Sequence, residues 1–290
     1  MSMLNLRFLL FPRLLFVFFT VYSVFTSSVF AFEKTPSIIL SGSKIQGGLL
    51  IGQVEPDTKV YLGDTQIKVA ENGVLVLGFG RDAELAQSLT IISASGNKHL
   101  EPITLKKKDY KIQRITGISK KIMSPNKKNQ ARSRSDAVLV RKAREIDSAR
   151  QDFLNGFIQP VEGPVTGVYG SQRFYNGQPK RPHFGVDYAA PVGTPVMAPA
   201  SGKVTMTHDD MFYSGGTLII DHGLGVSSTF LHLSKILVKE GEEVRQGDII
   251  ALVGKSGRAT GAHLDWRINW FKVRIDPQEV LRLKRIKTEL

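Results

Sequence analysis

Two short stretches of this sequence place histidine and aspartate side chains where they could bind one metal ion. In KRPHFGVDYAAP, His183 and Asp187 stand four positions apart. In TGAHLDWRINW, His263 and Asp265 stand two apart. Proline and glycine in the first stretch argue against a helix, and on an extended chain residues of the same parity point to one face. Each pair can therefore converge on one point.

The residue types limit what such a site could bind. The chain contains no cysteine, which excludes thiolate metal sites, disulfides and thiol nucleophiles. Imidazole nitrogen and carboxylate oxygen remain as zinc ligands, and a catalytic zinc site uses three ligands and leaves one position open for water. Zinc acidifies that water and polarises a carbonyl, and a nearby histidine can take the proton. His232, in SSTFLHLS, is a candidate for that role, and we expect it to share a strand face with Phe230.

Each candidate also has an interpretation without a metal. The HxxxD pair could be a hydrogen-bonded pair at the surface, because this spacing often arises by chance. His232 could be a core histidine that donates to the backbone. Asp265 could have no metal role and pair with Arg267 or Arg258.

The elements that must hold these residues are short strands. From Gly156 onward, alternating apolar and polar residues are separated by Gly/Pro turns, which is typical of antiparallel strands. In the last long run, Leu264 and Trp266 face the core, opposite His263 and Asp265. We therefore expect residues 157–285 to form an antiparallel β domain with a zinc groove.

Four other residues near these motifs are predicted either to line the groove or to have a structural role. Tyr169, Arg173 and Tyr188 could line the groove, whereas His222 is more typical of a structural residue at a turn.

The N-terminal half predicts a second β domain. Residues 32–115 contain short alternating runs separated by Gly, Asp, Asn and Pro, which favours a β-sandwich-like domain. Residues 116–156 predict a basic linker with a helix at about 136–154, capped by Asp136. On that helix, one apolar stripe would contain Val140, Ala143, Ile146 and Phe153. The whole chain is thus expected to be an all-β protein with this connecting helix.

The first 31 residues have the layout of a secretory signal peptide. Arg7 and Arg13 precede the apolar run LLFVFFTVYSVF, and Val29 and Ala31 occupy the −3 and −1 positions of a cleavage site. An uncleaved membrane anchor is the alternative, although the apolar run is shorter than the roughly 20 residues of a full span. We expect an exported protein of the periplasm or cell envelope.

Positive charge is concentrated in one segment. The chain has a formal net charge of +13, and residues 106–151, here called the basic segment, contain fifteen Lys/Arg and four Asp/Glu. For an exported protein, nucleic acid is excluded as a partner, and an anionic envelope surface or acidic wall polymer is favoured. A solvated basic linker is the alternative.

Four blocks of sequence together resemble the LytM/lysostaphin-type zinc metallopeptidases, peptidase family M23, of bacterial cell walls. The blocks are PHFGVDYAAPVGTPVMAPASGKV, DHGLGVSSTFLHLS, VKEGEEVRQGDIIALVG and TGAHLDWR, within residues 160–277. The N-terminal β domain is similar to the one that precedes this module in envelope members. The resemblance implies a zinc endopeptidase that hydrolyses peptide cross-links of peptidoglycan.

The resemblance also implies a role for each candidate residue. His183 and Asp187 match the first two zinc ligands, and His232 and His263 match the catalytic histidines. Asp265 stands where the family usually has a histidine as third ligand, so a second anion would make the metal a weaker Lewis acid. The alternatives are a non-catalytic or weakly active relative that activates an amidase, and a wall-binding protein.

Overall fold

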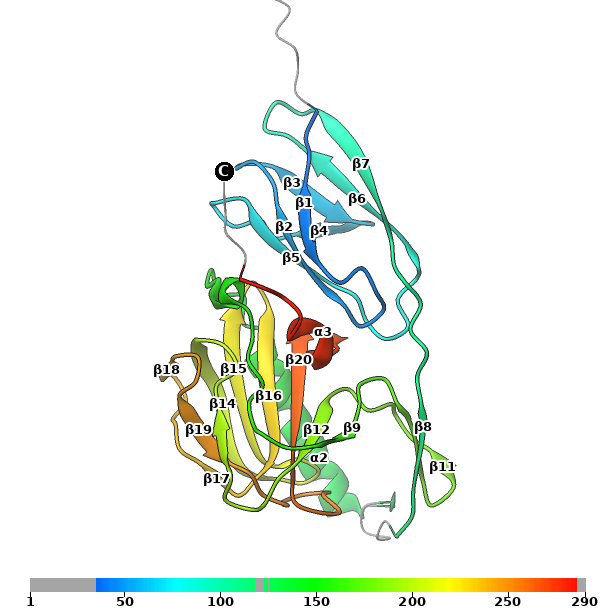
Figure 1. Cartoon of the computed structure of the whole chain (residues 1–290), viewed down its shortest axis with the longest axis vertical. Helices are drawn as coiled ribbons and strands as arrows, with labels where there is room; N and C mark the ends of the chain where they lie inside the picture. Colours follow the sequence, from blue (N-terminus) through cyan, green and yellow to red (C-terminus); the bar gives the residue numbers. More distant parts are fainter. Residues whose placement is uncertain (1–34, 118–122, 125, 286–290) are drawn as a thin grey trace, which may run out of the picture. The chain divides into compact units, whose positions relative to one another are not determined.

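The computed structural model describes residues 35–117, 123–124 and 126–285, so the predicted signal peptide lies outside the described residues. The N-terminal part folds into two sheets (Figure 1), which confirms the expected β architecture. One sheet has the order β1-β2-β5, with strands Ile39–Gly42, Leu49–Gln53 and Val74–Gly78. The other has the order β4-β3-β6-β7, with strands Thr65–Ile67, Lys59–Leu62, Ala86–Ile92 and Lys98–Thr104.

The core of this part follows from the alternation of apolar residues. In β2, Leu50 is buried with Leu75 and Leu77 of β5 in one apolar cluster, and Leu89 and Ile91 of β6 join it from the second sheet. Alternate residues of a strand point to opposite faces, so a period-two pattern is enough to build this core.

The C-terminal part is an antiparallel β domain, as expected. Its main sheet has the order β18-β14-β15-β16-β20-β12-β9, and β21 pairs with β20. These strands are Glu243–Val244, Gly202–Met211, Gly215–Gly223, Val226–Leu233, His263–Trp270, Val186–Ala189, Val165–Gly167 and Val273–Ile275. A second sheet, β13-β19-β17, comprises Pro195–Met197, Ile249–Leu252 and Lys235–Ile236.

Strand β20 is the central support of the site. Leu264, Trp266 and Ile268 are fully buried in the domain core, on the face opposite His263 and Asp265. This confirms the predicted alternation. Burial of three large apolar side chains fixes the register of the strand, because a slip by one residue would turn all of them out of the core.

Helix α2, Lys127–Arg144, differs from the predicted helix in both bounds. It begins nine residues earlier, where the side chain of Asn126 accepts a hydrogen bond from the Asn129 amide. The prediction that Asp136 caps the helix is therefore wrong, and its carboxylate instead accepts a hydrogen bond from the Phe212 amide. Asn126 is a good capping residue, but the basic run after it hid the start of the helix from an apolar-periodicity argument.

The predicted apolar stripe is also only partly correct. Val140 and Ala143 of α2 pack on Met206 and Met211 of β14. Ile146 is exposed, beyond the end of the helix. Phe153 enters the core from a separate 3-10 turn, Asp152–Asn155.

A small sheet and a short helix are also present. A small sheet joins the two halves of the chain, because β8, Ile112–Ile115, pairs in parallel with β10, Gln172–Tyr175, which pairs with β11, Gln178–Pro179. A short helix α3, Pro277–Val280, follows β21. Among the described residues, no helix has the length and apolar composition needed to cross a bilayer.

Candidate metal centre and groove

Three of the predicted ligands, His183, Asp187 and Asp265, come together in the C-terminal domain. Each offers one ligand atom, and these atoms lie within 4.8 Å of one another. His183 Nε2 is 3.0 Å from Asp187 Oδ1 and 3.4 Å from Asp265 Oδ2. Asp187 belongs to β12 and Asp265 to β20, and the two residues are directly paired across these antiparallel strands. The pairing brings together two residues that are far apart in the sequence.

The chemistry of this cluster fits a divalent metal such as zinc. His183 and Asp265 are 1% exposed. Neither ring nitrogen of His183 nor Oδ1 of Asp187 makes a well-aligned hydrogen bond, although His183 Nε2 lies 3.0 Å from Asp187 Oδ1. Buried polar atoms are seldom left in this state in a folded protein. Two ligand atoms bound tetrahedrally at zinc distances would be about 3.3 Å apart, close to the separations observed here. The residues present therefore form a metal-binding cluster.

Two glycines make room for the carboxylates. A Cβ atom on Gly185 would collide with Asp265 Oδ1, and one on Gly167 would collide with Asp187 Oδ2. Gly185 stands between His183 and Asp187, so the HxxxD spacing requires a residue without a side chain at this point. Close approach of the backbone to a functional group is a common reason for glycine.

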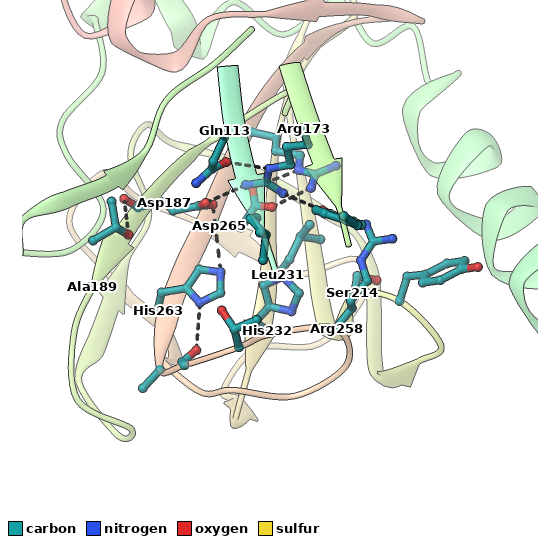
Figure 2. Close-up of a pocket in the computed structure, with 18 residues that line it drawn as sticks. Gln113, Arg173, Asp187, Ala189, Ser214, Leu231, His232, Arg258, His263 and Asp265 are labelled. Atoms are coloured by element: carbon teal, nitrogen blue, oxygen red, sulfur yellow. Dashed lines mark hydrogen bonds and ion pairs between the residues drawn. The ribbon is translucent and has the colours of Figure 1, made fainter. Parts of the chain in front are cut away.

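Arginine side chains hold both carboxylates in place. Arg173 Nη2 donates to Asp187 Oδ2 over 2.9 Å, which leaves Oδ1 directed at His183. Arg267 donates to both oxygens of Asp265, with Nε to Oδ1 at 2.9 Å and Nη2 to Oδ2 at 2.5 Å. Figure 2 shows Gln113 of β8 beside Arg173, and its side-chain oxygen accepts from Arg173 Nε.

Asp265 therefore combines the two roles that the sequence left as alternatives. It pairs with Arg267 and it also lies in the metal-binding cluster. Burial opposes its ionisation, but Arg267 and His183 hold the pKa of Asp265 well below its usual range. The carboxylate is thus an anion that can donate electrons to a metal.

An unusual backbone conformation, which the sequence did not predict, places the side chain of His232 in the groove. Phe230 lies in the core, and strict alternation would have put His232 on the same side. Instead His232 has a φ of 65°, which turns its side chain onto the groove face next to Leu231. The prediction that His232 shares a face with Phe230 is wrong. A positive φ is unusual for a residue other than glycine and is often found at functional sites.

The hydrogen bonds of His232 define its chemistry. Nδ1 donates to the carbonyl oxygen of Ser256 over 2.8 Å, so the neutral ring has its lone pair on Nε2. Burial is the main cause that lowers the pKa of His232 to about 4. The ring is therefore neutral at pH 7 and can accept a proton.

His263 lies beside His232, with ring centroids 4.8 Å apart. Its Nδ1 donates to the carbonyl oxygen of Gly261, which leaves Nε2 free and 4.0 Å from Asp187 Oδ1 (Figure 2). Both histidines thus lie at the edge of the metal-binding cluster, each with one nitrogen held by the backbone.

The cluster opens into a cavity of about 380 Å³. Of the three residues predicted beside the groove, only Arg173 lines this cavity. Tyr169 is buried, where it donates to the Arg274 carbonyl, and Tyr188 belongs to the domain core. Gln113 and Arg258 also line it, and neither was predicted to lie in the groove. The β8–β10 pairing that brings Gln113 there is a long-range contact with no local signal in the sequence.

His222 is structural, as predicted, although it lies within β15 and not at a turn. It is fully buried, its Nδ1 donates to the Ser201 carbonyl, and its Nε2 is 2.8 Å from Ser228 Oγ. Trp266 donates to that same Ser228 oxygen. The Ser228 hydroxyl is therefore free to donate to His222, which fixes the neutral tautomer of the ring.

Comparison with known proteins assigns a family to this domain. Residues 181–277 match peptidase family M23, a span that contains all three cluster residues and both catalytic-histidine candidates. The C-terminal domain is an M23 peptidase domain. It is the LytM/lysostaphin-like domain that the four sequence blocks implied.

Relatives of the M23 domain include two proteins of Vibrio cholerae. Peptidoglycan DD-endopeptidase ShyB is 37% identical over 123 residues, which are 42% of this chain and 26% of ShyB. Peptidoglycan DD-endopeptidase ShyA is 46% identical over 87 residues, which are 30% of this chain and 20% of ShyA. The chain thus spans about a quarter or less of the length of these curated relatives.

A solved structure matches more of the chain. A crystal structure of a Pseudomonas aeruginosa protein assigned to peptidase M23 is 28% identical, with a TM-score of 0.63. The match covers 82% of this chain and 95% of that one. Similarity at this level extends beyond the M23 domain itself, because that domain accounts for a smaller share of the chain.

Proposed function

We propose that this protein is a zinc metalloendopeptidase that hydrolyses peptide cross-links of bacterial peptidoglycan. The observation that carries the proposal is the buried cluster of His183, Asp187 and Asp265, whose ligand atoms lie within 4.8 Å of one another beside a groove in an M23 domain. The substrate class is supported by the similarity of this domain to two peptidoglycan DD-endopeptidases.

The chain's own residues divide the work of such a reaction. His183, Asp187 and Asp265 would hold the metal. A zinc ion in this position would supply a Lewis acid that polarises the scissile carbonyl and lowers the pKa of a water molecule. His232, neutral and with Nε2 free, is placed to accept a proton from that water.

His263 and the arginines complete the arrangement. His263 Nε2 faces the cluster and can donate a hydrogen bond when protonated, either to the developing oxyanion or to the leaving amine. Arg173 and Arg267 keep the two carboxylates in fixed orientations, so no reorganisation is needed when the substrate reacts.

We also propose that the protein acts in the periplasm or cell envelope after export by the segment 1–31. Peptidoglycan lies outside the cytoplasm, which agrees with the signal-peptide layout of that segment. The basic segment would then face anionic envelope surfaces.

The test is digestion of isolated peptidoglycan sacculi by the zinc-loaded protein, with and without a chelator. Released fragments are identified by mass. We expect chelator-sensitive release in which each cut adds one water and creates a new amine and a new carboxylate. His263→Ala should lower the rate by about 10²- to 10⁴-fold. His208→Ala, which changes a half-exposed histidine that does not line the groove, should not.

Two results of the sacculus digestion would contradict the proposed reaction. If zinc-loaded protein binds sacculi but releases no fragments, the peptidase proposal is wrong, and a non-catalytic regulator or wall-binding protein takes its place. Release that is unaffected by the chelator or by His263→Ala would exclude the metal mechanism.

A further inference from the structure

The groove contains three guanidinium groups, and only two of them have a carboxylate partner. Arg173 pairs with Asp187, and Arg267 pairs with Asp265. The third, Arg258, lines the same cavity, and among the described residues it forms no ion pair with Asp or Glu. An arginine inside a binding groove without an acidic partner is available to a ligand.

Aromatic rings hold Arg258 in position. Its guanidinium carbon lies 4.9 Å from the ring centroid of Tyr213 and 5.2 Å from that of Tyr175. Its backbone amide donates to the carbonyl of Tyr213 over 2.8 Å. Cation–π contacts fix the plane of the guanidinium but leave its N–H donors unused. Ligand binding would therefore cost little side-chain entropy.

The charge balance of the groove also favours an anion. The cavity wall contains three arginines and two aspartates, and it contains no Lys or Glu. A divalent metal ion would neutralise both aspartates and leave the guanidinium charges unbalanced. Burial, together with Arg267 and Arg173, already lowers the pKa of Arg258 against the opposing effect of Tyr175. A bound carboxylate would relieve this repulsion.

Arg258 lies to one side of the metal-binding cluster. Figure 2 shows Arg258 on the side of His232 and Ser214, whereas Ala189 lies on the other side of the cluster. Apart from Arg258, the arginines of the wall are occupied by the cluster aspartates. A peptide with one negative group would thus be bound in one direction along the groove.

We propose that Arg258 binds a free carboxylate of the substrate peptide, so that the groove selects cross-links with a carboxylate next to the scissile amide. This inference rests on the proposed peptidase function and names the substrate class of the same site. Arginine and carboxylate form a bidentate, charge-assisted pair that neither a carboxamide nor an uncharged side chain can replace.

The test uses two synthetic cross-linked peptides that differ only by a carboxylate or a carboxamide beside the scissile bond. kcat/KM is measured for the zinc-loaded wild type, Arg258→Met, Arg258→Lys and the control Arg245→Met, which removes an exposed arginine outside the cavity. The wild type and the control should prefer the carboxylate by about 10- to 100-fold. Arg258→Met should lose this preference, and Arg258→Lys should keep part of it.

A binding experiment separates this inference from the peptidase proposal. Calorimetric titration with analogues that are N-methylated at the scissile amide, and so cannot be cleaved, measures the same preference without turnover. A carboxylate preference in binding that disappears in Arg258→Met supports the assignment even if no peptide is cleaved, a result that would count against the peptidase proposal alone. The assignment is overturned if wild type does not distinguish the two peptides. It is also overturned if Arg258→Met weakens both equally, because that result indicates a structural role.

Discussion

At the scale of single residues, Asp265 is the most informative position. One carboxylate faces both His183 in the metal-binding cluster and the guanidinium of Arg267. An aspartate that shares its charge with an arginine is a weaker electron donor to a metal than a free carboxylate. This sharing offsets part of the effect of a second anionic ligand, so the exchange of histidine for aspartate is compatible with catalysis.

We predict that Asp265→Ala loses both the metal and the activity. The variant keeps only two ligands and leaves Arg267 without its partner. Zinc content, measured by elemental analysis after dialysis, should fall from about one ion per chain to a small fraction, and sacculus digestion should fall at least about 100-fold. Asp209→Ala, at an exposed acid, is the matched control. Full zinc content in Asp265→Ala would remove Asp265 from the ligand set.

His222 gives a prediction for the pH dependence of stability. Burial is the main cause that lowers its pKa in the folded protein. The unfolded chain therefore binds the proton first, and this contribution to stability is lost as the pH falls below about 6.5. The slope from one such group can reach about 1.4 kcal/mol per pH unit.

We expect His222→Gln to flatten the pH dependence of the free energy of unfolding between pH 7 and pH 5. Urea unfolding at both pH values measures the difference. His208→Gln, at a histidine that is only half-buried, should keep the slope of the wild type. Equal slopes in His222→Gln and wild type would mean that another group dominates acid destabilisation.

At the scale of elements, the site depends on how β12 lies against β20. The register pairs Asp187 with Asp265 and Ala189 with His263, so one strand pair carries two ligands and a catalytic-histidine candidate. Gly185, just before β12, touches the backbone and side chains of β20 so closely that no Cβ atom fits. The close approach of Gly185 therefore leaves room for Asp265 Oδ1 as well as for the backbone of β20.

We predict that Gly185→Ala moves β12 away from β20. Overpacking of this kind costs about 1–3 kcal/mol in the free energy of unfolding, and zinc affinity should fall with it. Thermal unfolding and zinc titration measure the two effects. The control is Gly80→Ala, where an added Cβ atom meets only Val273 at an ordinary 3.8 Å. If Gly185→Ala binds zinc like wild type, the close approach does not control the cluster.

At the scale of the whole molecule, the basic segment is only partly available to a partner. Lys108 pairs with Asp276 and Glu279, and Arg150 pairs with Asp152 and Glu243. Arg144 is buried and donates to Thr229. These contacts tie the segment to the M23 domain, so it is not a fully solvated linker. In the described part of the segment, the exposed cations that remain include Lys127, Lys128 and Arg134 of α2.

We predict that these three cations contribute to binding of anionic surfaces. Replacing Lys127, Lys128 and Arg134 together by Gln should weaken binding to phosphatidylglycerol vesicles by about fivefold for each charge at low salt, and less at high salt. Co-sedimentation measures the affinity. A control with Lys59, Lys98 and Lys203 replaced by Gln removes the same charge from exposed sites outside the segment. Equal losses in the two variants would indicate an effect of net charge alone.

The sequence by itself determined the chemistry of the site. The absence of cysteine left only nitrogen and oxygen ligands, and the spacing of His183 with Asp187 and of His263 with Asp265 put each pair on one face. The alternation in β20 and the β architecture of both halves also followed from period-two patterns. These features are local, because they depend on residue type and on neighbours in the chain.

Only the tertiary structure decided how these residues meet. The Asp187–Asp265 pairing, the partnership of Arg173 with Gln113 and the Tyr175–Arg258–Tyr213 stack join segments distant in the sequence. The φ of 65° at His232 cannot be read from its residue type, because only a small fraction of non-glycine residues adopt a positive φ, even among the types in which it is enriched. A local pattern indicates which residues of a strand face the core. The choice of partner strand and the strain in the backbone are imposed by the packing of the whole domain.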